Sequence, residues 1–586
     1  QAIDKRLAQE PDREHLQVQA ALVHRAQIMT IDSFCLNLIR DHFNLLDIDP
    51  AFRIGDEGEL LLLRADVMGQ MLEEYYEAED KVFGQFVETY ATDSGIEDYI
   101  LQVYTFSQSN PFPEDWLASC RKELLEMEEG KLSETKWMKY LIKDIKAQAE
   151  ELAEQLESAM EICQMDGGPQ VYLPTLQAEA EMIRRIGAAK NYKELNQRLE
   201  DASFGRIGAA RGKDIDPEKK AYASACRDRV KKAVGNLKNL YGQQTEKEAA
   251  EAILGSRDVV LKLVELAEEF HKRYQETKKD KNIVDFNDLE HEALRILIKK
   301  EGETLSYTSV ADELSRRYAE ILVDEYQDSN DVQETLIQSL SAERFKRPNV
   351  FMVGDVKQSI YKFRLARPEL FMGKYDSYKE YEGNTEVYGE ETAKGKKIEL
   401  RQNFRSRASV LESINEVFFQ IMTKNLGNIQ YTDRVALHAG AVFQETEKNV
   451  GTPTELLVVN TGKKVIGPPD QELEEYTSRE MEARLIASRI RQMMDPKTGL
   501  SVWDKEKNCY RLVQYGDIVI LLRSVVGWTD SFLNVLTQED IPTFAETGTG
   551  YFDTIEVETV LAMLAVIDNP MQDIPLATVL KSVIIG

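Results

Sequence analysis

Two short apolar runs that each end in acidic residues constrain the fold of this chain most strongly. Ile321–Val323 runs directly into Asp324 and Glu325, and Val350–Val353 is followed after one glycine by Asp355. The residues between the two runs have helical periodicity. Strands that alternate with helices are typical of a parallel sheet, so we predict two parallel strands whose acidic ends meet at one sheet edge.

The spacing of apolar residues divides the chain into a helical part and a part that mixes helices with strands. From about Glu57 to Phe270, apolar residues recur at spacings of three and four, and strand signals are scarce. Further short β-rich runs follow at Ile398–Leu400, Leu456–Val459 and Ile518–Leu522. The predicted fold class is therefore α/β, with a large all-α insertion.

Length and composition narrow the class of protein. With 586 residues the chain holds about four domains, and no apolar run reaches the roughly 20 residues of a membrane span. The five cysteines are widely spaced, which predicts reduced thiols and a cytoplasmic location. The net charge of −29 by itself argues against a nucleic-acid partner.

The acid pair at Asp324 and Glu325 has two interpretations. A carboxylate that binds Mg²⁺ beside one that positions water is the arrangement that phosphoanhydride hydrolysis requires. Alternatively, the acids begin a helix that Asp328 or Ser329 caps. The pattern of this strand alone does not separate the two.

A local excess of positive charge follows the second strand. The segment from Lys357 to Arg367 contains four basic residues and no acid, and it interleaves them with Tyr361 and Phe363. Cations that contact phosphates and aromatic rings that stack on bases suit single-stranded nucleic acid. The alternative is an ordinary helix with aromatic core anchors and a solvated basic face.

A second basic segment surrounds Leu400–Ser406. From Lys394 to Arg407 the local charge is +5. An arginine here could reach across a domain interface and stabilise charge on a transferring phosphoryl group. A basic helix start or a salt-bridged interface would produce the same pattern.

Together, the three segments resemble the motifs of superfamily 1A DNA helicases of the UvrD/PcrA/RecB kind. The resemblance is carried by D-E-x-Q-D, then G-D-x-K-Q-S-I-Y-x-F-R, then N-F-R-S, in this order. Further matches lie at Thr30–Cys35, Asp285–Leu289 and Tyr515–Arg523. Within the family, the chain looks most like helicase-nuclease subunits of the AddA type, on Leu46–Asp56 and Phe363–Phe371 among other stretches.

The resemblance implies roles for single residues. Asp324 would hold Mg²⁺, Glu325 would activate water, and Gln358 would sense the γ-phosphate of ATP. Arg405 would contact that phosphate from a second motor domain, and Phe404 would stack on adenine. The residues implied to touch single-stranded DNA are Thr30, Ser33, Tyr361, Phe363 and Arg364, whereas Phe34 is interpreted equally well as core packing.

The resemblance also implies a domain order. Residues 1–56 and 266–390 would form a first RecA-like domain, interrupted by a helical insertion at 57–265. Residues 391–570 would form a second RecA-like domain, and 571–586 would begin a further region. The implied partners are single-stranded and duplex DNA ends and an AddB-like protein in a heterodimer, and the parent protein would process double-strand ends for recombinational repair.

The sequence departs from the family pattern at two places. No G-x-x-x-x-G-K-[S/T] loop occurs in the 586 residues, and both ends look cut, so we expect a fragment that does not turn over ATP itself. Asp32 stands where many relatives carry histidine, and a carboxylate cannot donate to a DNA phosphate. The alternatives are a UvrD/PcrA-like helicase without a nuclease and a non-catalytic DNA-binding scaffold.

The predicted insertion contains a basic run of its own. Ser203–Tyr241 has ten basic residues against four acids, including Arg227, Arg229, Lys231 and Lys232. Such a run could guide duplex DNA or a protein partner. A solvated helix face is the more common meaning of this pattern.

Overall fold

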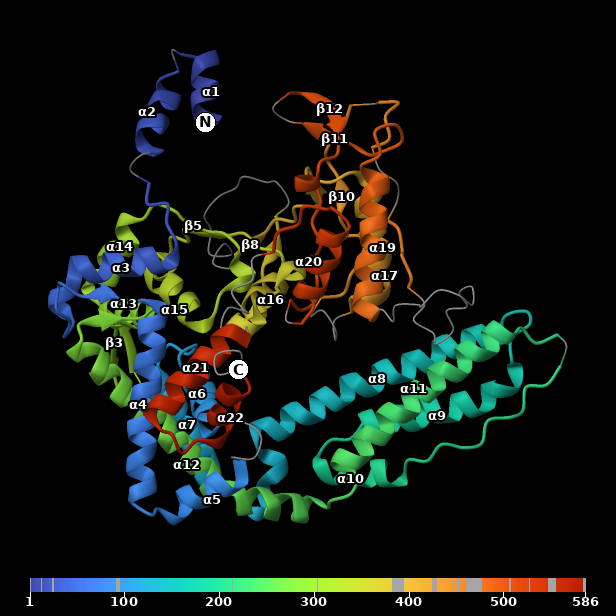
Figure 1. Cartoon of the computed structure of the whole chain (residues 1–586), viewed down its shortest axis with the longest axis horizontal. Helices are drawn as coiled ribbons and strands as arrows, with labels where there is room; N and C mark the ends of the chain where they lie inside the picture. The colour runs from blue at the N-terminus through green and yellow to red at the C-terminus, as the bar shows by residue number, and fades with distance from the viewer. Residues whose placement is uncertain are drawn as a thin grey trace. The chain divides into compact units, whose positions relative to one another are not determined.

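A computed structural model gives the fold of the chain (Figure 1). It describes residues 2–582 except 12, 24–25, 91–94, 213, 303, 382–394, 424–428, 445, 451–453, 460–476, 505–506, 526 and 546–554. The chain forms two compact units, residues 1–399 with 423–430 and residues 400–422 with 431–586. The predicted domain boundary at residue 390 lies outside the described residues.

The α/β core of the first unit contains the two predicted apolar strands that end in acidic residues. β5 (Ile321–Val323) pairs in parallel with β6 (Val350–Met352), as predicted, and α15 (Asp331–Leu340) connects them. A second parallel pair joins β1 (Arg53–Ile54) to β2 (Ile283–Val284). The apolar core of this region draws its side chains from helices α3 (Ile31–His42), α13 (Phe286–Leu297), α14 (Ser309–Arg317) and α15.

The segment that the sequence predicts to be helical contains helices and connecting loops, and no strand among its described residues. Most of these helices carry an N-terminal cap, such as Asp56 before α4 and the reciprocal Thr245–Glu248 capping box before α12. The helices are α4 (Glu57–Glu77), α5 (Lys81–Tyr90), α6 (Ile96–Ser107), α7 (Pro113–Leu125), α8 (Lys136–Gln164), α9 (Leu173–Gly187), α10 (Tyr192–Asp201), α11 (Pro217–Tyr241) and α12 (Glu246–Asp280).

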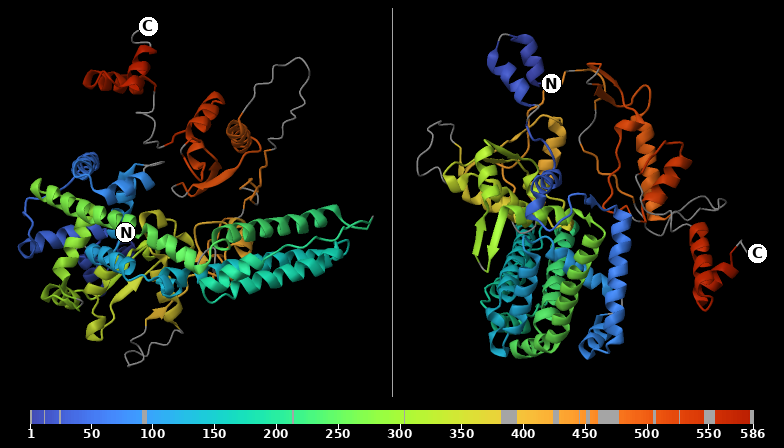
Figure 2. Two further views of the ribbon diagram at one scale, coloured as in Figure 1. Left: turned by 90° about the horizontal axis from the view of Figure 1, so that it is seen from below. Right: turned by 90° about the vertical axis from the view of Figure 1, so that its left-hand side faces the viewer.

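Helices α8, α9, α10 and α11 pack into an elongated bundle (Figures 1 and 2). Small residues let these helices approach closely: a Cβ built on Gly187 would lie 2.7 Å from the Cβ of Ala149. Arg227, from the basic run, is buried here and makes a bidentate ion pair with Glu179. The solvated-face interpretation is therefore wrong for Arg227, whereas Arg229, Lys231 and Lys232 are exposed.

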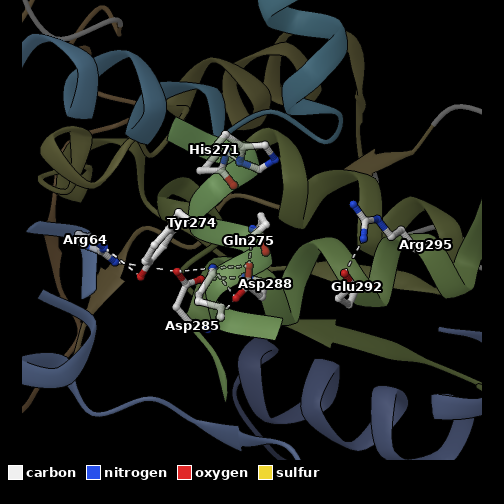
Figure 3. A network of polar contacts seen from close by, with 10 residues as sticks. Arg64, His271, Tyr274, Gln275, Asp285, Asp288, Glu292 and Arg295 are labelled. Atoms are coloured by element: carbon white, nitrogen blue, oxygen red, sulfur yellow. Dashed lines mark hydrogen bonds and ion pairs between the residues drawn. The ribbon is translucent and has the colours of Figure 1, made fainter. Parts of the chain in front are cut away.

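A buried ionic network joins α4 and α12 to α13 (Figure 3). The Lys278 side chain is 1% exposed, and its ammonium lies 2.9 Å from Asp285 Oδ2 and 2.6 Å from Asp288 Oδ2. The two carboxylates also form the reciprocal capping box of α13, and Arg64 donates to the Tyr274 hydroxyl at 3.2 Å. The D-F-N-D-L segment that the resemblance singles out thus ties the helical segment to the α/β core.

The first unit contains several further elements. They are α1 (Ala2–Gln9), α2 (Glu14–Val23), the β3–β4 hairpin (Ile298–Glu301 and Thr304–Tyr307), α16 (Pro368–Ser377) and the parallel pair β7–β8 (Lys379–Glu380 and Lys396–Lys397).

The second unit is built on a helix pair and short strands. α19 (Ser478–Met493) packs on α20 (Thr529–Gln538) through side chains such as Ala487, Ile490 and Leu536. The other elements are the parallel pair β9–β10 (Gln402–Asn403 and His438–Ala439), α17 (Ala408–Ile421), the β11–β12 hairpin (Ser501–Asp504 and Cys509–Leu512), α21 (Ile555–Asp568) and α22 (Asp573–Leu580).

Three predicted strands are wrong. Ile398–Leu400, Leu456–Val459 and Ile518–Leu522 form no strand, because none of them pairs with another strand in the sheets of the described chain. Several of their β-forming side chains are largely exposed to solvent, such as Leu456 (88% exposed) and Leu521 (88% exposed). High β-propensity produces a strand only where a partner strand and a packing surface are present.

Two findings bear on the class of protein. All five cysteines are free thiols, as predicted. Within the described ranges, none of the helices is long and apolar enough to span a bilayer.

Candidate active site

Asp324 and Glu325 lie on a sharp turn at the carboxyl end of β5. Glu325 has left-handed backbone dihedrals, φ 48° and ψ 39°, and its N–H donates to Asp324 Oδ1 at 3.1 Å. A non-glycine residue rarely adopts this conformation, and such residues concentrate at functional sites. Both carboxylates are exposed at the sheet edge, where a ligand can reach them. The alternative helix-capping role falls to Asn330 instead, whose side chain caps α15.

The end of β6 places Gln358 beside Asp355. The Asp355 side chain accepts from Gln358 Nε2 at 3.0 Å and from the Lys357 N–H at 3.1 Å. The Lys357 ammonium also lies 2.8 Å from this carboxylate. Asp355 thereby orients the exposed Gln358 side chain at the same sheet edge as the acid pair.

Gln327 connects the two strand ends, and the sequence patterns did not single it out. Its side chain is buried and contacts both Glu325 and the main chain of Asp355. In the sequence, Gln327 is marked only as the fourth residue of the D-E-x-Q-D motif. The pattern of apolar runs, from which the strands were predicted, does not predict a buried amide side chain between two loops.

The predicted DNA-contact residues after β6 form an exposed aromatic and cationic group. The rings of Tyr361 and Phe363 are 38% and 75% exposed, and their centroids lie 5.9 Å apart. The Arg364 guanidinium lies over both rings, at 5.2 Å and 5.7 Å from their centroids. The segment is a short 3-10 turn rather than the helix of the alternative interpretation, and its rings are not core anchors.

The Thr30–Phe34 segment divides into capping, core and partly solvated residues. Thr30 is the N-cap of α3: its Oγ1 accepts from the Ser33 N–H at 3.2 Å and donates to Ser33 Oγ at 2.9 Å. Phe34 packs edge-on against Tyr318, with ring centroids 6.5 Å apart, as part of the core. Thr30 and Ser33 are exposed and remain predicted DNA contacts, whereas Phe34 has the packing role.

Asp32 and Glu290 are two acids on neighbouring helices of this region. Half-buried Asp32 has a raised pKa because burial disfavours its charged form. Burial, and to a lesser extent the Asp32 charge, raises the pKa of Glu290 from 4.5 to about 7, although Gln333 Nε2 donates to its carboxylate at 2.8 Å. The surroundings of Asp32 are thus unsuited to an anionic phosphate.

Replacing Glu290 by glutamine is expected to stabilise the protein at alkaline pH. The folded-state pKa of Glu290 lies above its usual value, so its contribution to stability is present at low pH and is lost as the pH rises through about 7. Thermal unfolding should show a gain on the order of 2 kcal/mol for Glu290→Gln at about pH 8 and a much smaller gain at about pH 5. A pH-independent difference, like that expected for the exposed control Glu313→Gln, would contradict this account.

In the second unit, Asn403 shapes the loop that carries Phe404 and Arg405. Its side-chain oxygen accepts from the N–H groups of Arg405 and Ser406, both at 2.9 Å. The Phe404 ring is 70% exposed and lies against Gly440, where an added Cβ would be 2.8 Å from the ring. Phe404 therefore presents an open aromatic face, which suits stacking on a planar base.

Residues 1–379 match the UvrD/REP helicase N-terminal domain, and residues 398–586 match the UvrD-like helicase C-terminal domain. The chain belongs to the UvrD/REP helicase family. Within this family, all of the chain matches an ATP-dependent helicase/nuclease subunit of Lachnoclostridium phytofermentans at 42% identity, over 44% of that protein. Proteins of the same name from Clostridium beijerinckii and Clostridium perfringens are 36% and 39% identical, and 47% of each is covered.

The chain thus spans about half the length of the curated relatives it matches. Among the described residues, no group of three or more His, Cys, Asp or Glu side chains could hold a metal ion by itself. A Mg²⁺ ion is commonly held by one or two carboxylates together with phosphates and waters, and needs no larger cluster of side chains. The exposed carboxylate of Asp324 fits such a donor.

Proposed function

We propose that this chain is the motor part of an ATP-dependent DNA helicase and nuclease subunit that moves along single-stranded DNA. The observation that carries the proposal is the sheet edge where Asp324, Glu325 and Gln358 meet, followed directly by the Tyr361–Arg364 turn. A nucleotide bound at this edge and a DNA strand on the adjacent turn would contact the same loop. ATP binding and grip on DNA would then depend on one another.

Each residue at the edge has a chemical task in this proposal. Asp324 holds Mg²⁺, which neutralises charge on the phosphates when it is bound. Glu325 accepts a proton from the attacking water, and Gln358 hydrogen-bonds the γ-phosphate. Phe404 stacks on adenine and Arg405 stabilises phosphate charge, both from the second of two RecA-like domains.

The domain assignment is part of the same proposal. Residues 1–56 and 266–390 build the first motor domain, 57–265 are inserted into it, 391–570 build the second, and 571–586 begin a further region. The parent protein works in the cytoplasm with an AddB-like partner and processes duplex DNA ends for recombinational repair. The names of the relatives contain the words "nuclease" and "subunit", which supports the proposed nuclease activity and partner of the parent protein.

The 586 residues themselves are expected to hydrolyse no ATP. They contain no G-x-x-x-x-G-K-[S/T] loop, whose lysine and hydroxyl residue supply principal contacts to phosphate and Mg²⁺. Tests of ATP turnover therefore use the full-length gene product, whereas DNA binding is tested on the chain itself.

Single-stranded DNA binding by this chain is expected to depend on Phe363 and Arg364. The double variant Phe363→Ala, Arg364→Ala removes a stacking surface and a phosphate-binding cation, so affinity should fall about tenfold or more. Fluorescence anisotropy with a labelled oligothymidylate at several salt concentrations measures both the affinity and its salt dependence.

A matched control removes the same two kinds of side chain elsewhere. Tyr140 on α8 is 72% exposed and follows Lys139, so Lys139→Ala, Tyr140→Ala changes charge and aromatic content equally. This control should leave the affinity within about twofold. Equal affinities for the wild-type chain and the Phe363, Arg364 variant would refute the assignment of this turn to DNA.

A further inference from the structure

Gln327 is buried between the carboxyl ends of β5 and β6, with 1% of its surface exposed. Its Nε2 donates to Glu325 Oε2 at 2.8 Å, and its Oε1 accepts from the main-chain N–H of Asp355 at 2.9 Å. A carboxylate accepts only from the NH₂ group, and an N–H donates only to the amide oxygen. The two contacts therefore require the same orientation of the amide.

The Gln327 contacts are part of a continuous series of hydrogen bonds. The Tyr326 N–H donates to the Val353 carbonyl at 2.9 Å, which holds the two strand ends together beside the amide. Beyond Gln327, the Asp355 side chain accepts from Gln358 Nε2 at 3.0 Å. The series runs from Glu325 through Gln327 and Asp355 to Gln358.

Gly354 provides the space that the Gln327 amide occupies. A Cβ built on Gly354 would lie 2.6 Å from Gln327 Oε1 and 3.2 Å from the Gln327 main-chain nitrogen. Real Cβ atoms do not approach an oxygen so closely, so a side chain at position 354 must displace the amide. Gly354 and Gln327 are therefore complementary, and each can be altered to test the other.

The Glu325 carboxylate depends on this amide for its orientation. In the described part of the chain, Gln327 is the one residue that donates a side-chain hydrogen bond to it. Glutamate has three side-chain torsions, so an exposed Glu325 without this contact would populate several rotamers. A reacting group that is displaced by about 1 Å loses much of its rate advantage.

We propose that Gln327 is a positioning residue that orients Glu325 toward the attacking water and links this orientation to the Asp355–Gln358 loop. The proposal rests on the proposed function, because it assigns Gln327 a task in ATP hydrolysis. Gln327 touches neither nucleotide nor DNA in this account. Its loss thus changes the chemical step and leaves both binding steps unaltered.

The test is Gln327→Met in the full-length gene product, because methionine keeps the length of the side chain and removes both polar contacts. The kcat for ATP should fall about tenfold to a hundredfold, with KM for ATP and the single-stranded DNA affinity within about twofold. The matched control is Gln333→Met, since Gln333 also donates to a buried carboxylate, that of Glu290, at 2.8 Å but lies outside the series. This control should keep its kcat.

Two measurements separate positioning from a general loss of folding. Hydrogen exchange of the peptide that contains the Asp355 amide should become faster in Gln327→Met at an unchanged melting temperature. Gly354→Ala should lower kcat in the same direction. A kcat that falls equally in Gln333→Met, or an exchange rate at Asp355 that does not change, would overturn the proposal.

The outcome of Glu325→Gln distinguishes this proposal from the proposed function. If Glu325→Gln abolishes turnover and Gln327→Met leaves kcat unchanged, the positioning role is wrong and the motor function stands. If Glu325→Gln itself leaves turnover intact, the proposed site is wrong, and the positioning role fails with it.

Discussion

Replacing Glu325 by glutamine in the full-length gene product is expected to lower kcat for ATP about a hundredfold or more. Glutamine has nearly the same shape, and its side-chain oxygen can still accept from Gln327 Nε2, so the turn after β5 should keep its structure. The variant loses only the capacity to take a proton from water. Steady-state ATP turnover measures the effect, and single-stranded DNA affinity should stay within about twofold.

Glu320→Gln is the matched control for this substitution. Glu320 is also exposed and directly precedes β5, so it lies at the opposite end of the same strand. Its replacement makes the same change in charge away from the candidate site and should leave kcat unaltered. Undiminished turnover in Glu325→Gln would place hydrolysis elsewhere in the protein.

Replacing Lys278 by methionine is expected to destabilise the first unit by about 3–5 kcal/mol. Burial opposes the charged ammonium, but the Asp288 and Asp285 carboxylates raise the pKa of Lys278 above its usual value. The ammonium also lies 4.4 Å from the centroid of the Tyr274 ring. Methionine fills the same space, yet it leaves the buried Asp288 carboxylate without its ammonium partner and Asp285 with only the more distant Arg64, at 3.9 Å. Removing one partner of a buried ionic network is strongly destabilising.

The neighbouring lysine supplies the control for this prediction. The Lys279 side chain is 61% exposed and pairs with the exposed Asp47, so Lys279→Met should produce little or no change. Urea denaturation followed by hydrogen exchange in α12 and α13 reports on this region without assuming a single transition for the whole chain. Equal stabilities for the two variants would show that the buried network is unimportant for folding.

The sequence predicted those parts of the fold that depend on local pattern. β5 and β6 were predictable because each apolar run ends in polar residues and a helical segment lies between them, as a parallel connection requires. The helices from α4 to α12 follow from apolar spacing in the same way. The segments at 456–459 and 518–522 have equal β-propensity and form no strand, since pairing depends on a partner that their own residues do not specify.

The sequence predicted the candidate-site residues that follow the ends of strands. It did not predict the residue whose side chain bridges two strand ends. Asp324, Glu325 and Gln358 follow from strand ends and family motifs, and the structure places them at one edge. Gln327 was missed because its side chain contacts Asp355, 28 positions away in the sequence. For Arg227 the error was to predict a solvated side chain. A run of basic residues in the sequence does not show that one of them is buried in an ion pair with Glu179.

Whole-chain charge and local charge favour opposite predictions about a nucleic-acid partner. The whole-chain charge of −29 argues against nucleic acid, whereas the Tyr361–Arg364 turn and its neighbours carry a local positive charge. At physiological ionic strength, charges more than about 8 Å apart are largely screened, so a DNA strand on this turn experiences mainly the nearby cations. If the proposed function holds, local charge beside exposed rings is the more informative signal.

The DNA dependence of ATP turnover tests the central claim most directly, because it requires the sheet edge and the adjacent turn to work together. We expect the full-length gene product to hydrolyse ATP faster when single-stranded DNA is added, with a stimulation that weakens as salt rises. The stimulation should be lost in Phe363→Ala, Arg364→Ala and the turnover itself in Glu325→Gln. Turnover that is identical with and without DNA in the wild-type protein would contradict the account.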